Sequence, residues 1–170
     1  MTIRGFEGTE ADRKEIVRLH DQWMRANVNF NIPDAVGVFV GGDGFHGFNL
    51  NGHTYGKRDE WVQLWTFLKS VMVIGDVRGE RDLRVNIRGD VAWVSFEADL
   101  IVKALNTGGA ADSGMALPAE PMSMHFRGSE VFVRQDDTGA KNWKMWHCHY
   151  SPHAPAGEPR PAFGDVGYPR

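Results

Sequence analysis

Cysteine is almost absent from the sequence. Cys148 is the only cysteine in 170 residues, so the chain can form no internal disulfide and no thiolate cluster for a metal ion. The glycine-rich stretch at 41–44 also lacks the lysine and the hydroxyl residue of a phosphate-binding loop. These absences exclude a disulfide framework, a thiolate metal centre and a Walker-type nucleotide site.

A charge excess and long apolar runs are missing as well. The formal net charge is −3, with lysine and arginine spread along the chain, whereas nucleic-acid binding needs a basic stripe or patch. No apolar run has transmembrane length, and residues 1–15 lack the apolar core of a signal peptide. We therefore expect no nucleic-acid partner, no membrane contact and a cytoplasmic location.

The composition is otherwise that of a globular protein with many aromatic residues. Hydrophobic residues make up 42% and charged residues 24% of the chain, which is typical of a globular domain. The 6 tryptophans and 10 phenylalanines can fill a core or wall a pocket for an aromatic ligand. The length suffices for one domain with a substantial core. We predict a single domain at 1–153 and a proline-rich tail at 154–170.

The spacing of the apolar residues predicts three helices. The first covers about residues 10–27, begins after Thr9 as N-cap and has an apolar stripe that includes Trp23 and His20. We interpret His20 as a packing residue. A short second helix begins at 31–34, with a proline in its first turn. The third covers about residues 57–72, where Trp61 and Trp65 lie one turn apart and could wall a pocket.

The remaining segments alternate in polarity and predict strands. A strand at 45–50 is followed by the hairpin signal Asn51-Gly52. Further strands are predicted at 82–88, 91–103, 125–134 and 141–151. The tract 104–124 is rich in small residues and long for a simple connection, so we predict a lid or rim loop there.

The last predicted strand, KNWKMWHCHYS at 141–151, contains the most side chains that could take part in catalysis. Strict alternation would place Met145, His147 and His149 on one face, and Cys148 and Tyr150 on the other. The first face runs from apolar to polar, as expected when one end of a strand seals a core and the other lines a cavity. The alternative is a core strand whose two histidines are merely hydrogen-bonded.

Five segments together resemble the NTF2-like superfamily, in particular its SnoaL-like branch. They are NGHTYGKRDEW at 51–61, DLRV at 82–85, GDVAWV at 89–94, RGSEVF at 127–132 and WKMWHCHYS at 143–151. Serine stands at 129 where that branch has threonine. The resemblance covers about residues 10–153. It implies an α+β cone with three helices packed in a curved, largely antiparallel sheet, and a homodimer formed through the outer face of that sheet.

The candidate site residues are those that could reach one cavity mouth in such a cone. A histidine can exchange a proton near neutral pH, a carboxylate can orient its ring, and an arginine or a tyrosine can stabilise developing negative charge. The predicted catalytic residues are His147 as first choice of base, His46 as second, His149, Glu97 and Arg127. The predicted substrate-binding residues are Trp23, Phe45, Phe48, Asn49, Tyr55, Trp61, Trp65, Asp99 and His125.

Three classes of function fit these residues. The first is a proton-transferring enzyme without cofactor or metal that acts on a small apolar or aromatic molecule. The second is a metal-dependent enzyme, since His147-Cys148-His149 has a metal-ligand spacing, but a third ligand is not recognisable. The third is a ligand-binding or assembly module without catalysis.

We expect the first class. The resemblance points to a lyase acting on a hydroxylated aromatic compound, for example one that releases formaldehyde from a lignin-derived diaryl molecule. An isomerase, a dehydratase or a polyketide cyclase is the alternative on the same fold. Nothing in the residues themselves selects among these substrates.

Overall fold

The computed structural model describes residues 8–105 and 119–153. Most of the predicted lid, at 106–118, and the predicted tail at 154–170 lie outside the described residues, and the last residues of the predicted lid, 122–124, belong to a strand. The helices are α1 (Glu10–Asn27), α2 (Ile32–Val38) and α3 (Arg58–Val71), with short 3-10 turns at Val28–Phe30 and Gly42–Gly44. The strands are β1 (His46–Phe48), β2 (Thr54–Tyr55), β3 (Met72–Arg88), β4 (Val91–Ala104), β5 (Met122–Arg134) and β6 (Trp143–Pro152).

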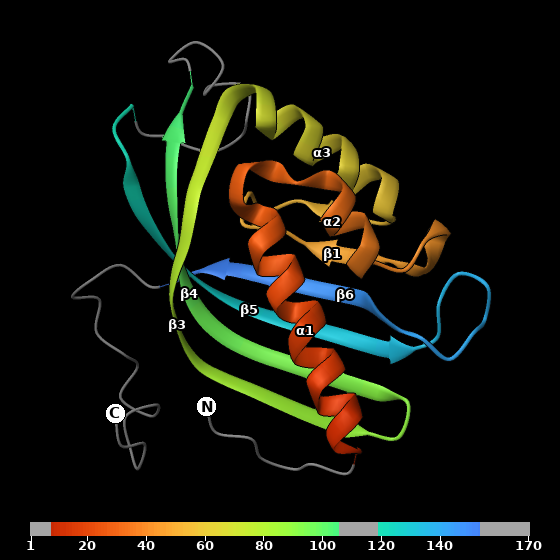
Figure 1. The fold of residues 1–170 in the computed structure, drawn as a ribbon. Coiled ribbons are helices and arrows are strands. Elements are labelled where there is room, and N and C mark those ends of the chain that lie inside the picture. Colours follow the sequence, from red (N-terminus) through yellow and green to blue (C-terminus); the bar gives the residue numbers. More distant parts are fainter. Residues whose placement is uncertain (1–7, 106–118, 154–170) are drawn as a thin grey trace, which may run out of the picture.

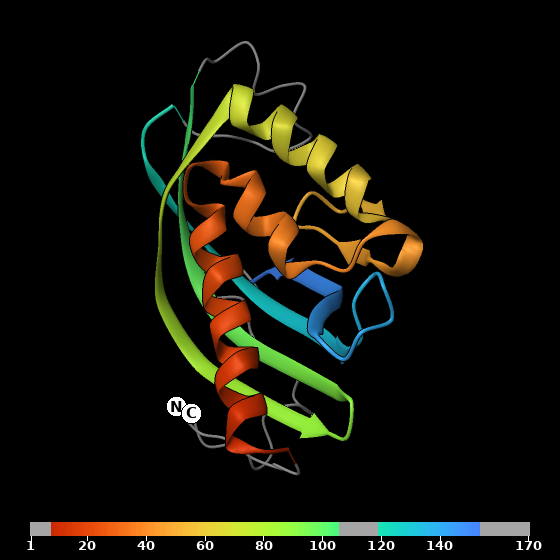
Figure 2. The same ribbon diagram turned by 45° about the vertical axis from the view of Figure 1, so that its right-hand side comes forward.

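The six strands form one open, curved sheet in the order β2-β1-β6-β5-β4-β3. Only the β1–β6 pair is parallel, and the other neighbours are antiparallel. The two ribbon views show all three helices on the concave side of this sheet (Figures 1 and 2). The predicted α+β class and the mixed, largely antiparallel sheet are confirmed. None of the helices in the described part of the chain is long and apolar enough to cross a membrane.

Helix α1 forms where the sequence predicts it. Thr9 accepts a hydrogen bond from the backbone N–H of Asp12, whose side chain bonds back to the N–H of Thr9, and this capping box satisfies the first turn. The apolar stripe of Ile16, Leu19 and Trp23 is buried against the sheet. Helix α1 thereby also buries His20 beside this stripe.

Strand β3 begins ten residues earlier than predicted. Its first half, 72–81, contains Gly75, Gly79 and four charged residues, so the sequence shows no alternation there. The pairing with β4 shifts register three times between Ile74 and Arg84, and Gly79 has a φ of +62°. These irregularities turn Glu80 toward helix α1 and Arg81 toward the outer face, as their side-chain partners show.

The prediction of which residues share a face of β6 is wrong, because the strand contains a β-bulge. Val131 pairs with His147, whereas its neighbour Phe132 pairs with Met145, so Trp146 is an extra residue with no partner in the pairing. Each extra residue reverses the alternation beyond it. Cys148 and Tyr150, predicted to face outward, therefore point into the concave side with Trp143 and Met145. His147 and His149, predicted to line the cavity, lie on the convex side.

Candidate functional site

An apolar cavity lies between the helices and the concave face of the sheet. Its walls include Phe30, Trp61, Trp65, Leu100, Phe126 and Tyr150, with Asn27 and Asn49 as polar members. The cavity volume is about 50 Å³, whereas an apolar cavity of about 150 Å³ holds a benzene ring. Leu50 and Met124, also lining residues, are only half-buried. A ring-sized ligand therefore needs these rim side chains to move outward.

Aromatic rings make up one side of this cavity because two helices present them at helical spacing. Trp23 of α1 lies 4.9 Å from Trp65 of α3 between ring centroids, and stacks over Tyr150 at 6.1 Å with an interplanar angle of 25°. Trp61 is 2% exposed, and its indole N–H has no hydrogen-bond partner among the described residues. A buried unpaired donor costs about 1–3 kcal/mol, so a ligand oxygen would stabilise it.

A buried chain of hydrogen bonds leads away from the cavity. Trp23 Nε1 donates to the Tyr150 hydroxyl at 2.5 Å, and this hydroxyl donates to Glu130 Oε1 at 3.1 Å. His20 Nδ1 donates to Glu130 Oε2 at 2.8 Å, and His20 Nε2 donates to Glu80 Oε1 at 2.5 Å. The side chains of His20 and Glu130 are 1% and 0% exposed, while that of Glu80 is 34% exposed. The chain thus connects the cavity to the protein surface.

The charges in this chain are set by burial and by the neighbouring carboxylates. Burial alone lowers the pKa of His20, but the charge and hydrogen bond of Glu130, joined by Glu80, outweigh it and raise the pKa to about 10. Burial, and then the charge of Glu130, raises the pKa of Tyr150 well above its usual value. At neutral pH the protonated ring of His20 therefore lies between the carboxyl groups of Glu130 and Glu80.

Sequence reasoning missed most of this chain. His20 was predicted as packing, Glu130 was not singled out, and Tyr150 was predicted on the outer face. Glu130 did leave a signal. It occupies the inward series of β5 with Phe126, Gly128 and Phe132, and a carboxylate in such a series needs a partner.

The predicted catalytic histidines lie together on the convex face. His46 pairs with His147 across the parallel β1–β6 strands, their Nδ1 atoms are 3.2 Å apart, and their rings stack with centroids 5.3 Å apart. Phe48 packs edge-on against both His147 and His149 with ring centroids 5.4 Å apart in each pair. Burial lowers the pKa of His147. These three histidines form a patch that the sheet separates from the cavity.

The other predicted residues divide between the two sides of the sheet. Glu97 and Asp99 of β4 pair with Arg127 and His125 of β5 on the convex face. Four of the predicted substrate-binding residues line the cavity: Trp23, Asn49, Trp61 and Trp65. Two more lie behind the cavity wall, in contact with Trp61. The ring centroid of the fully buried Phe45 is 5.5 Å from that of Trp61, and the ring centroid of Tyr55 is 5.3 Å from it. The catalytic roles of the convex-face residues stay predictions.

Solved structures share this fold at low sequence identity. An NTF2-like superfamily protein from Salmonella enterica aligns with a TM-score of 0.68 and 14% identity over 90% of this chain and 100% of that one. A candidate dehydratase of the NTF2-like family from Streptomyces avermitilis gives 0.66 and 14% over 85% and 99%. A ketosteroid isomerase-like protein from Erwinia carotovora gives 0.65 and 13% over 86% and 100%. At these identities the likeness establishes the fold alone.

Sequence comparison identifies the family. No curated protein has a significantly similar sequence. The family model of the SnoaL-like domain matches residues 16–155, which is most of the chain. The protein therefore belongs to the SnoaL-like domain family, and it shares its fold with NTF2-like proteins.

Proposed function

We propose that the protein is a cofactor-independent enzyme that transfers a proton on a small, apolar, hydroxylated molecule in the cavity. The observation that carries the proposal is Tyr150, a residue that lines the apolar cavity and whose hydroxyl is hydrogen-bonded to the buried Glu130. A proton-transfer catalyst needs a group that can both give and accept a proton beside the substrate. Tyr150 backed by a carboxylate provides this without a metal or an organic cofactor.

The reaction begins with a proton moving from a substrate C–H bond to the Tyr150 oxygen. As it arrives, the proton of Tyr150 moves to Glu130 along their hydrogen bond of 3.1 Å. The raised pKa of Tyr150 disfavours a free phenolate, and this coupled transfer avoids forming one.

The reaction class depends on the substrate atom to which Tyr150 then gives its proton. If Tyr150 gives the proton to a departing hydroxyl group, the C–H electron pair becomes a double bond as the C–O bond breaks, and water leaves. This is the carbon–oxygen lyase reaction, which we place first. If the proton returns to a second carbon, the reaction is an isomerisation, our alternative.

The cavity constrains the substrate. Its aromatic and aliphatic walls favour an apolar ring, and the unpaired N–H of Trp61 suits a substrate oxygen. The volume of about 50 Å³ favours a molecule smaller than a diaryl compound. A single-ring hydroxylated molecule is therefore the preferred substrate class, in place of the lignin-derived example that the resemblance implies.

Hydrogen–deuterium exchange tests the proposal without a known substrate. Single-ring hydroxy and keto compounds are incubated with the protein in D2O, and NMR follows exchange at carbon and product formation. Tyr150→Phe keeps the ring but removes the hydroxyl, and we expect the rate to fall by about 10²–10⁴-fold. His147→Ala on the convex face is the matched control, and it should keep the wild-type rate. The opposite pattern would move the active site to the histidine patch, and binding without exchange would favour a ligand-binding module.

We also propose a homodimer formed through the convex face. Two large aromatic side chains lie exposed there, Phe48 at 38% and Trp93 at 41%, beside Val131 and the histidine patch, since Trp93 pairs with Val131 and Val131 with His147. An exposed apolar group of this kind on the outer face of a sheet favours association with a second copy. Light scattering of the wild-type protein measures the assembly.

A further inference from the structure

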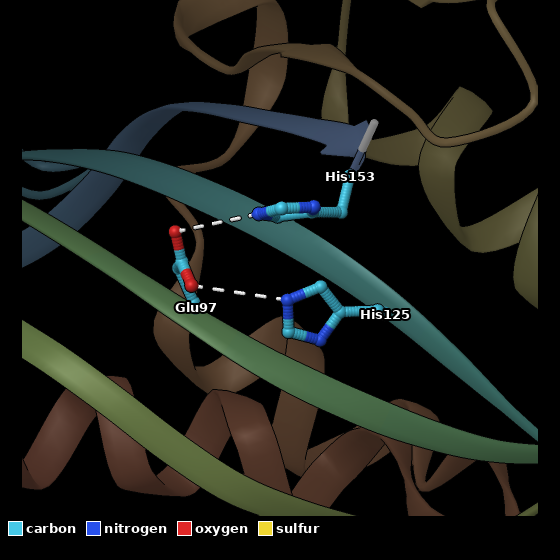
Figure 3. A group of neighbouring side chains, drawn as sticks. All are labelled: Glu97, His125 and His153. Atoms are coloured by element: carbon cyan, nitrogen blue, oxygen red, sulfur yellow. Dashed lines mark ion pairs between the residues drawn. The ribbon is translucent and has the colours of Figure 1, made fainter. Parts of the chain in front are cut away.

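We propose that Glu97, His125 and His153 form a binding site for a divalent transition-metal ion on the convex face. Figure 3 shows the three side chains converging, with each oxygen of the Glu97 carboxylate facing a nitrogen of one imidazole. Glu97 comes from β4 and His125 from β5, while His153 follows the end of β6. The site is separate from the cavity, because the sheet lies between them, and it does not depend on the proposed function.

The geometry is close to that of a bound metal site. The ligand atoms of the three residues lie within 4.8 Å of one another. His125 Nε2 is 3.8 Å from Glu97 Oε2, and His153 Nε2 is 3.9 Å from Glu97 Oε1. Metal–ligand bonds of about 2.0–2.2 Å place tetrahedral ligands about 3.4 Å apart. The two Glu97–histidine pairs would therefore have to shorten by about 0.4–0.5 Å, and the widest pair by up to about 1.4 Å, to bind the ion, which side-chain rotations can supply.

The backbone holds these residues in place. Asp99 pairs with His125 in the β4–β5 ladder, so Glu97, two residues away, projects from the same face of the sheet. The N–H of His153 donates to the carbonyl of His125 at 3.2 Å, which keeps the two histidines adjacent. Their ring centroids are 4.5 Å apart.

Asp99 provides a second, independent feature of a metal site. Metal-binding histidines commonly donate their other ring N–H to a carboxylate, which sets the tautomer. His125 Nδ1 donates to Asp99 Oδ1 at 2.7 Å, so the lone pair is on Nε2, the ring nitrogen that lies 3.8 Å from Glu97 Oε2. Two imidazole nitrogens and one carboxylate are a ligand set for Zn²⁺ and Fe²⁺ with positions left for water or another ligand.

Arg81 is the internal competitor of the ion. Its Nη1 donates to Asp99 Oδ2 at 3.0 Å, and its Nη2 donates to His125 Nε2 at 2.9 Å. The charges of Glu97, Asp99 and Arg81 sum to −1 with neutral histidines, which favours a cation. Binding displaces the guanidinium from His125 Nε2, while the bond to Asp99 can remain. The proposal therefore predicts that removal of Arg81 strengthens metal binding.

Calorimetric titration of the tag-free full chain with Zn²⁺ tests the site, with Co²⁺ absorption as a report on the ligand set. We expect one ion per chain with a Kd tighter than about 100 µM. His153→Ala should weaken binding by about 100-fold or more, since ligand loss costs at least as much as loss of an outer partner. Glu97→Gln should do the same and Arg81→Gln should tighten binding. His149→Ala removes a convex-face histidine outside the cluster and is the matched control.

The outcomes separate clearly. Wild-type binding weaker than about 100 µM overturns the site, as does unchanged binding in His153→Ala. Equal weakening in His149→Ala assigns the ion to the histidine patch and also overturns the proposal. Circular dichroism of each variant confirms folding. Because His153 is exposed and lies beyond the end of β6, its variant remains informative if Glu97→Gln loses stability.

Discussion

The pKa of histidine is shifted in opposite directions on the two sides of the sheet. On the concave face, His20 is fully buried between Glu130 and Glu80, and these carboxylates raise its pKa to about 10. On the convex face, the partner of His147 is the imidazole of His46, and partial burial lowers the pKa of His147. Burial disfavours the charged ring in both places, and only paired carboxylates reverse that effect. The residue type alone thus does not decide which histidine is charged at neutral pH.

The largest expected difference between the faces is in stability. Glu130→Gln removes a buried carboxylate that holds both His20 and Tyr150, and breaking a buried ion pair costs about 3–5 kcal/mol. Glu97→Gln on the convex face removes ion pairs of 3.7–3.9 Å with side chains 31–42% exposed, which is worth less than about 1 kcal/mol. Urea unfolding of both variants measures the contrast. Similar losses of stability in the two variants would show that the buried network of Glu130 contributes no more than the exposed ion pairs of Glu97.

The dependence of stability on pH should also differ in sign between the faces. The folded pKa of His20 is raised, so its contribution is complete below the unfolded pKa of about 6.5 and is lost as pH rises toward about 10. The folded pKa of His147 is lowered, so its contribution is present above about pH 6.5 and is lost as pH falls below that value. Stability should therefore be greatest near pH 6.5.

Urea unfolding from pH 5 to 8 measures the free energy of unfolding on both sides of the expected maximum near pH 6.5. The upper limit avoids the cysteine and tyrosine groups, whose folded pKa values are raised and whose unfolded forms titrate above about pH 8. His20→Gln should flatten the pH dependence above pH 6.5, and His147→Gln the dependence below it. A wild-type stability that rises steadily from pH 6.5 to 8 would contradict the assigned charge of His20.

The smallest expected effect concerns the apolar end of the convex face. Trp93→Glu places a charge on the proposed dimer interface, and its side chain is 41% exposed in the single chain. We expect a monomer in light scattering, with the stability of the monomer changed by no more than about 0.5 kcal/mol. Phe67→Glu, whose side chain is 38% exposed on helix α3 on the other side of the sheet, is a control for added charge. A dimer that survives Trp93→Glu would place the interface elsewhere.

Local sequence patterns predicted most of the fold. The bounds of α1 follow from its cap and stripe, and the turn at Asn51-Gly52 follows from glycine, whose φ there is +79°. Cavity residues that lie on helices, such as Trp23, Trp61 and Trp65, were also predicted. In each case the signal depends on residues within a few positions of one another, which a single sequence displays.

The sequence by itself determined the order of the elements, the apolar faces of the helices and the low net charge. Only the tertiary structure decided the site. One extra residue at Trp146 reverses the faces of β6, and a two-residue period gives no warning of such an insertion. The partners of His20 lie 60 and 110 residues away in the sequence. The chemistry of a buried charge depends on the groups that the fold brings beside it, and a local pattern cannot show them.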